Sequence, residues 1–231
     1  MAEKTLYTAI GRFERRTNGC GRSFPVVVLG GREYMVDLQE MVLWSLLNWR
    51  IARKEEIGEQ YQNTCHGAEC TVSRSWEACV DRLLIRGLLI SGSGETEYDA
   101  LYDLLSSLYI IPVDSTFPMR IVSFLHLTLF RQAPFTAARR LFQKDHRNER
   151  ETEIMCLAKQ AFLSTAEIIR CIDKGVSRIR SEQALLEQLY DDEETTSDNI
   201  ASMTKCVPSS RNVIVAVANL YLRQQIMFER I

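Results

Sequence analysis

The cysteines and histidines of the chain could support metal or acid–base chemistry, but their spacing completes neither kind of site. Cys65, His66 and Cys70 place two thiols and one imidazole within six residues. A structural zinc ion needs four ligands, and no second pair follows at a usable spacing. The other two histidines, His126 and His146, belong to no metal or nucleophile motif. We therefore expect no metal, no cofactor and no catalytic residue, and a protein that is not an enzyme.

Arginine side chains on one predicted helix suggest a different chemistry, the binding of nucleic acid. The pattern of residues 73–86 predicts an amphipathic helix with Trp76 on its apolar face, and Gly87 is suited to end it. The opposite face carries Arg74, Ala78, Asp81, Arg82 and Ile85, and its arginines and short side chains are what a helix in the major groove of DNA requires. The predicted DNA-binding residues, including arginines from the amino-terminal segment, are Ser73, Arg74, Ser75, Ala78, Arg82, Arg12, Arg15 and Arg16.

The charge of the chain is close to balance, so any DNA surface must be local. The whole chain has a formal net charge of −2. Residues 1–35 carry six Lys and Arg against three Asp and Glu, a local net charge of +3. We expect this basic segment to add contacts to phosphate groups.

The predicted elements around these residues follow the order of a winged helix. Strand patterns occur at 6–13, 24–29 and 32–36, with Gly30 and Gly31 as a hairpin turn between the last two. Two helices are predicted at 37–48 and 53–62, and the third helix leads into an apolar strand that ends at Ile90. Residues 91–99 would then form a short wing, which is acidic, before a helix that runs to about residue 108.

Residues 80–89 resemble the recognition helix and wing entry of MarR-type and related bacterial winged-helix regulators. The resemblance covers roughly residues 37–91. It implies that Ser73, Arg74 and Ser75 meet DNA near the start of the helix and that Arg82 lies close to the DNA backbone. The long basic wing of those regulators is missing from this sequence.

Residues 26–44, together with the two helices and the Gly-Leu-Leu at 87–89, also resemble the small winged-helix peptide-recognition domains of modified-peptide biosynthesis. In those domains an edge strand of the leading hairpin pairs with a leader peptide. The resemblance implies that the matching surface is formed by strands 24–29 and 32–36. It supports an alternative function, a protein- or peptide-binding module with no role on DNA.

The second half of the chain is predicted to be helical throughout. The expected helices are at 119–131, 135–144, 152–163, 165–174, 177–190, 197–204 and 209–230. The last of these is apolar almost all round, so it must be buried on more than one side. We expect the same helix of a second chain to cover one side, with Val213, Val217, Leu220 and Tyr221 near the centre of a homodimer interface.

These patterns together predict a mainly α protein with a small β component. A winged helix-turn-helix domain with a leading β-hairpin would occupy residues 1–112, and an all-α dimerisation or sensing domain would occupy residues 113–231. The predicted function is a non-enzymatic transcriptional regulator that binds double-stranded DNA. No apolar run approaches the length of a membrane span, and the chain start lacks the apolar core of a signal peptide, so we expect a cytoplasmic protein.

Overall fold

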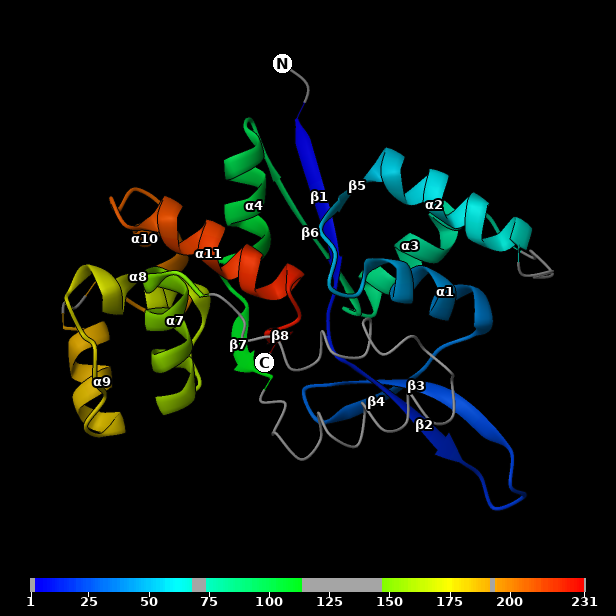
Figure 1. The fold of residues 1–231 in the computed structure, drawn as a ribbon, viewed down its shortest axis with the longest axis horizontal. Coiled ribbons are helices and arrows are strands. Elements are labelled where there is room, and N and C mark those ends of the chain that lie inside the picture. Colours follow the sequence, from blue (N-terminus) through cyan, green and yellow to red (C-terminus); the bar gives the residue numbers. More distant parts are fainter. Residues whose placement is uncertain (1–2, 68–73, 114–146, 192–193, 231) are drawn as a thin grey trace, which may run out of the picture.

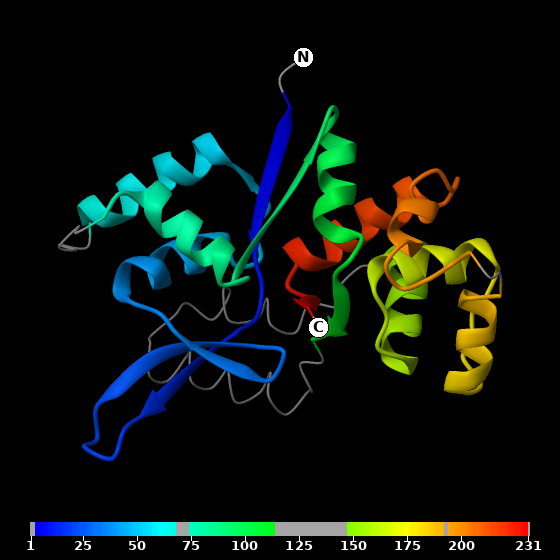
Figure 2. The ribbon, with the colours of Figure 1, turned by 180° about the vertical axis from the view of Figure 1, so that it is seen from behind.

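The first strand of the chain forms the centre of its first sheet. The computed structural model describes residues 3–67, 74–113, 147–191 and 194–230. Strand β1 (Lys4–Ala9) pairs antiparallel with β5 (Ala52–Arg53) on one side and with β6 (Leu89–Gly94) on the other. Helices α1 (Leu38–Leu47), α2 (Lys54–Gly67) and α3 (Trp76–Ile85) lie on one side of this sheet, and α4 (Glu97–Leu105) lies on the other (Figures 1 and 2).

A second antiparallel sheet has the strand order β2 (Arg12–Thr17), β3 (Ser23–Leu29), β4 (Arg32–Met35). Gly30 and Gly31 form the predicted turn between β3 and β4, with φ values of 56° and 72°. The single strand predicted over residues 6–13 is wrong, because the chain bends at Gly11 and passes from one sheet to the other. Gly11 has a φ of 89°, and a Cβ atom there would lie 2.8 Å from the Val28 carbonyl oxygen.

The predicted wing after α3 is a strand that packs directly on a helix. Strand β6 continues through Gly94, and α4 begins three residues later, at Glu97. The strand beside β6 is β1, which comes from the start of the chain. Gly92 and Gly94 allow the close approach, since a Cβ atom at Gly92 would lie 2.2 Å from the backbone nitrogen of Leu104. The sequence pattern predicts a turn at these glycines. In the structure they allow β6 and α4 to pack closely.

The second half combines helices with a strand. Its described elements are α7 (Glu149–Gln160), α8 (Thr165–Asp173), α9 (Glu182–Leu189), α10 (Ile200–Thr204), α11 (Ser210–Leu222) and β8 (Ile226–Glu229). The last helix is shorter than predicted, because Gln224 has a φ of 60° and ends it. Residues 226–229 then alternate between buried and half-buried side chains and pair with β7 (Tyr109–Pro112). The helices predicted at 119–131 and 135–144 lie outside the described residues.

The predicted fold class is therefore wrong. The described residues are 47% helix and 22% strand and form three small antiparallel sheets, which makes this a mixed α/β fold. Strand β8 shows that the second half is not all-α. The boundary predicted after residue 112 falls at the end of β7, whose pairing partner β8 belongs to the second half, and one apolar core contains residues from both halves.

Helix α11 is buried on several sides, as its composition predicts, but within its own chain. Val213, Val217 and Leu220 are 0% exposed and Tyr221 is 2% exposed. They pack among α4, α7, α8 and β8 of the same molecule. These four side chains therefore do not form a surface for a second copy, because α11 is buried in the core of its own chain (Figure 1).

The hydroxyl group of Tyr221 joins the two halves of the chain. It accepts a hydrogen bond from the Trp49 backbone N–H, donates one to the Ala9 carbonyl and bonds the Thr8 hydroxyl, each over 2.9 Å. Burial raises the pKa of Tyr221 to about 12. Helix α11 is thereby fixed to β1 and to the segment after α1.

Replacing Tyr221 by Phe should lower the free energy of unfolding by about 1–3 kcal/mol at neutral pH, because buried polar groups lose their partners. The raised pKa makes a second prediction about pH. The contribution of the protonated Tyr221 hydroxyl to the free energy of unfolding is fully present below pH 10. It is lost as the pH rises toward about 12. Denaturant titrations at several pH values should show a steeper alkaline loss for the natural protein than for Tyr221→Phe. Equal slopes above pH 10 would contradict this assignment.

Candidate functional site

The predicted DNA-binding helix starts later than expected, and its first residues have structural roles. Ser73 lies outside the described residues. Ser75 is the N-cap of α3, and its hydroxyl accepts a hydrogen bond from the Ala78 backbone N–H over 3.3 Å. Arg74 forms an ion pair with Asp37, the N-cap of α1, and this hydrogen bond raises the pKa of Arg74. Arg74 and Ser75 therefore fix the start of α3 against α1.

A buried carboxylate holds the other arginine of that predicted face. The side chain of Glu40 is 1% exposed and accepts a hydrogen bond from Arg82 Nε over 2.7 Å. Arg86 donates to the second oxygen of the same carboxylate over 2.9 Å. Glu40 also closes the capping box of α1 by accepting the Asp37 backbone N–H. Arg82 is thus part of the contact between α1 and α3.

The surface that α3 leaves exposed is partly acidic and partly apolar. Its exposed residues include two acids, Glu77 and Asp81, together with Ile85, which is 86% exposed. Acidic side chains repel phosphate, and the arginine on this surface, Arg82, is already paired. Asp81, Arg82 and Ile85 of the predicted face are thus exposed, and both of its arginines, Arg74 and Arg82, are held in ion pairs.

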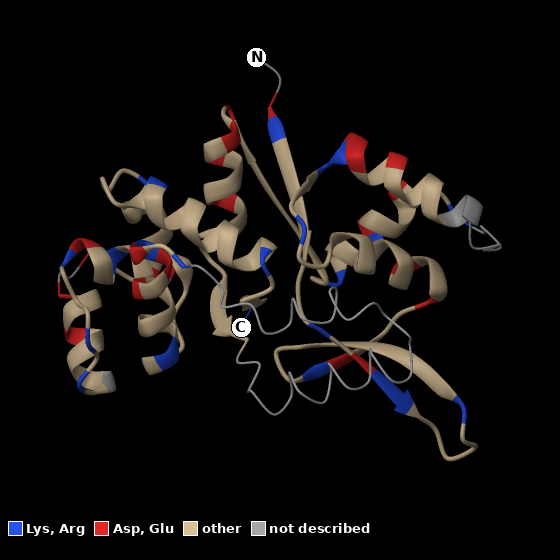
Figure 3. Cartoon of the chain, viewed as in Figure 1, with Lys and Arg blue, Asp and Glu red and all other residues tan. Residues whose placement is uncertain are grey.

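The basic amino-terminal residues belong to a strand of the second sheet. Arg12 pairs with Glu14, and Arg16 pairs with Glu14 and Glu33. The hydrogen bond to Glu33 is the main cause that raises the pKa of Arg16. Arg15 is exposed on the same strand, β2. Figure 3 shows blue and red segments on this sheet.

The outer edge of β4 carries backbone groups that no described strand pairs. The two-residue turn makes Leu29 and Arg32 a hydrogen-bonded pair, and antiparallel pairs alternate along a strand. The N–H and C=O groups of Glu33 and Met35 therefore point away from β3. Arg86 donates a hydrogen bond to the Met35 carbonyl. Among the described strands none pairs with this edge, so the Glu33 N–H, the Glu33 C=O and the Met35 N–H face outward.

Three exposed apolar side chains lie at the end of β4, at the start of α1 and at the end of α3. The large apolar residues with the highest exposed fractions in the described part of the chain are Ile85 at 86%, Met35 at 67% and Leu38 at 65%. Met35 ends β4, Leu38 begins α1 and Ile85 ends α3. We call the unpaired edge of β4 together with these three side chains the β4 groove.

A hollow of about 750 Å³ adjoins the groove at the turn between β3 and β4. Arg32 and Tyr34 line it from β4, and Ile85 and Arg86 line it from the end of α3. Phe162, which follows α7, completes an apolar wall. The Arg86 guanidinium lies 5.9 Å from the centre of the Tyr34 ring. The hollow thus combines aromatic surface with positive charge.

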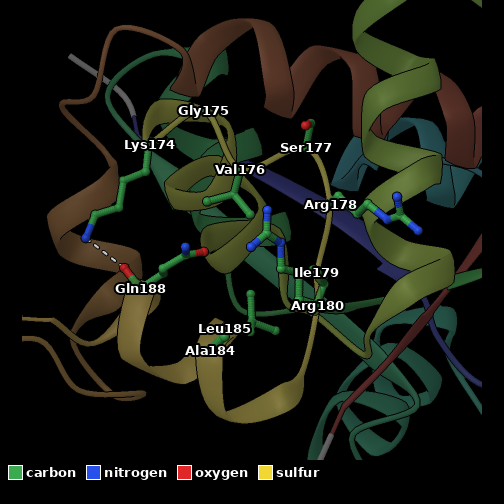
Figure 4. Close-up of a pocket in the computed structure, with 10 residues that line it drawn as sticks. All are labelled: Lys174, Gly175, Val176, Ser177, Arg178, Ile179, Arg180, Ala184, Leu185 and Gln188. Carbon is green, nitrogen blue, oxygen red and sulfur yellow. Dashed lines mark hydrogen bonds between the residues drawn. The ribbon is translucent and has the colours of Figure 1, made fainter.

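A second hollow, of about 760 Å³, lies between the end of α8 and α9. Arg180 and Gln188 point toward its middle, and Arg178 points away (Figure 4). Lys174 at its rim is bound to the Gln188 carbonyl over 2.7 Å and to Asp191 over 2.5 Å. This hollow adjoins neither an unpaired strand nor an exposed apolar patch, and the β4 groove is the stronger candidate.

The sequence indicated the strands of this site, 24–29 and 32–36, through the resemblance to peptide-recognition domains. It did not predict the side-chain contacts of the site, because they join distant residues. The capping box of Asp37 and Glu40 and the Gly-Gly turn could be predicted from local spacing. The binding of Glu40 to Arg82 and Arg86 could not, because more than 40 residues separate the partners. The cysteine pair at 65–70 lies beyond the side chains that the structure describes. Within the described residues no group of three His, Cys, Asp or Glu is placed to hold a metal ion.

Replacing Glu40 by Gln should lower the free energy of unfolding by about 3–5 kcal/mol, because Arg82 and Arg86 would lose a buried charged partner. Asp81→Asn is the matched control on the exposed face of α3 and should change stability by less than about 0.5 kcal/mol. Urea denaturation of both variants measures the difference. Similar small losses in the two variants would show that Glu40 does not hold α1 and α3 together.

Comparison of the chain with family models, with curated proteins and with solved structures gives no match. No helix in the described residues has the length and apolar character needed to cross a membrane. The function of the chain is therefore argued from the geometry of the β4 groove.

Proposed function

We propose that the protein binds an extended peptide segment of a partner protein, which adds to β4 as a further strand. The observation that carries this proposal is the unpaired outer edge of β4 beside the exposed side chains of Met35, Leu38 and Ile85. Backbone hydrogen bonds along such an edge supply affinity, and neighbouring side chains supply specificity.

The two edges of the second sheet differ in a way that favours β4. Strand β2 carries four charged residues among its six, and charged side chains protect an edge against pairing. Strand β4 begins with Arg32 and Glu33 but ends with Tyr34 and Met35. An added strand on β4 would therefore cover apolar surface as well as backbone groups.

Helix α3 gives the groove its second wall. Arg86 connects the end of α3 to β4 through the Met35 carbonyl and the Tyr34 ring, so the helix end and the strand edge are held at a fixed separation. This arrangement agrees with the resemblance to winged-helix peptide-recognition domains, in which an edge strand of the leading hairpin pairs with the peptide. The ion pairs of Arg74 with Asp37 and of Arg82 with Glu40 weaken the DNA-binding hypothesis, since these are the arginines of α3 that would have to reach DNA.

The test uses a phage-displayed library of random 12-residue peptides and the full chain. Selected peptides should bind Glu33→Pro at least about tenfold more weakly than Glu33→Ala, because proline removes an outward N–H while both variants remove the same charge. Proline is tolerated at an edge position whose N–H faces solvent, and circular dichroism checks the fold.

A second measurement leaves the protein unchanged. Peptides that are N-methylated at one position at a time should lose affinity at alternate positions only, because every second N–H of an added strand faces β4. Equal affinity of Glu33→Pro and Glu33→Ala, or a lack of alternation, would overturn the proposal. Failure of any peptide to bind, together with a duplex DNA that binds sequence-specifically and loses affinity with Ile85→Glu, would favour the regulator hypothesis.

A further inference from the structure

We infer that the hollow at the β3–β4 turn selects an acidic side chain of the bound segment, placed two residues from an apolar one. The inference rests on the proposed function and specifies the chemistry of the partner. Arg32 and Tyr34 share one face of β4, so alternate residues of an added strand would lie beside them.

The positive charge of the hollow exceeds its negative charge. Arg32, Arg86 and Arg230 line it, against one acid, Glu229. The Glu229 carboxylate accepts a hydrogen bond from the Gly30 backbone N–H over 2.6 Å, which fixes the end of β8 beside the turn. The described side chains that line the hollow therefore carry a net charge of +2.

Two of these arginines are available to a ligand. Arg86 is already bound to Glu40 and to the Met35 carbonyl. Arg32 and Arg230 are exposed, and neither has an ion-pair or side-chain hydrogen-bond partner within the part of the chain that the structure describes. Guanidinium groups bind carboxylates through charge-assisted hydrogen bonds, which are stronger than neutral ones. These two arginines suit the side chain of Asp or Glu.

The apolar part of the hollow fits the neighbouring residue of such a segment. Phe162 is 48% exposed and stacks on Tyr109 with ring centres 4.6 Å apart, so its outer face is held in place and open. Ile85 lies beside it in the lining of the hollow. An apolar side chain at the level of Tyr34 would contact this wall while the acidic side chain two positions away reaches Arg32.

The charge of the surrounding sheet supports the same partner. Residues 12–35 contain five arginines and two glutamates, a net charge of +3. Figure 3 shows blue segments on β2 and β4. A positive surface of this kind speeds the association of an acidic segment and disfavours a basic one.

The test measures the affinity of a selected peptide and of its Glu-to-Gln or Asp-to-Asn form for three proteins. These are the full natural chain, the double variant Arg32→Gln with Arg230→Gln, and the control Arg15→Gln, which changes an exposed arginine on β2. The double variant should bind the acidic peptide about tenfold more weakly and the amide form with unchanged affinity. The control should lose much less affinity for the acidic peptide than the double variant does, because Arg15 lies on β2, at the other edge of the sheet.

The possible outcomes separate the inference from the proposed function. Equal losses for the acidic and amide peptides, or no acidic residue two positions from an apolar one among the selected peptides, would overturn the inference while Glu33→Pro still tests the β4 edge. A loss of affinity on amidating the peptide's carboxyl terminus, with no loss for the Glu-to-Gln form, would also overturn it. That result would show that Arg32 and Arg230 bind the carboxyl terminus of the peptide and not an acidic side chain.

Discussion

The buried carboxylate of Glu40 fixes the relation between α1, α3 and β4. It accepts hydrogen bonds from Arg82 and Arg86, and Arg86 continues to the Met35 carbonyl and the Tyr34 ring. A carboxylate with 1% exposure is stable only when such donors satisfy it. The width of the β4 groove and the loss of free arginines on α3 therefore have the same physical cause.

The position of β1 is the second constraint on the site. Because β1 comes from the chain start and fills the centre of the first sheet, β6 has no hairpin partner and leads directly into α4. The chain then bends at Gly11 into β2, which places the second sheet next to α1 and α3. In this arrangement the described residues after α3 form no hairpin wing that would extend toward DNA. The outer edge of β4 lies beside the end of α3, and no described strand pairs with it.

Local patterns predicted much of the first half of the chain, and long-range pairing decided the rest. The Gly30–Gly31 turn and the three helices follow from spacing and caps, and the apolar face of α3 is confirmed by the burial of Cys79, Val80 and Leu83. The sequence predicts helix over β8, because Ile226 and Phe228 continue the apolar run of α11. Only the pairing with β7 shows that their side chains alternate as in a strand.

The charges of the site were the least predictable feature. Arg74 and Arg82 look free on a helical wheel, yet their partners Asp37 and Glu40 are more than 35 residues away in sequence. The apolar composition of α11 did indicate burial on several sides, but composition cannot distinguish a partner chain from the protein's own core. The sequence alone therefore does not show which surface side chains are already paired by tertiary contacts.

Amide hydrogen exchange at β4 is the most direct test of the central claim that a peptide adds to this strand. In the free protein the Glu33 and Met35 N–H groups should exchange faster than the Tyr34 N–H, which faces β3. Saturation with a library-selected peptide should slow Glu33 and Met35 and leave Tyr34 nearly unchanged. Protection that does not change at Glu33 and Met35 while the peptide is bound would show that binding occurs elsewhere and would contradict the account.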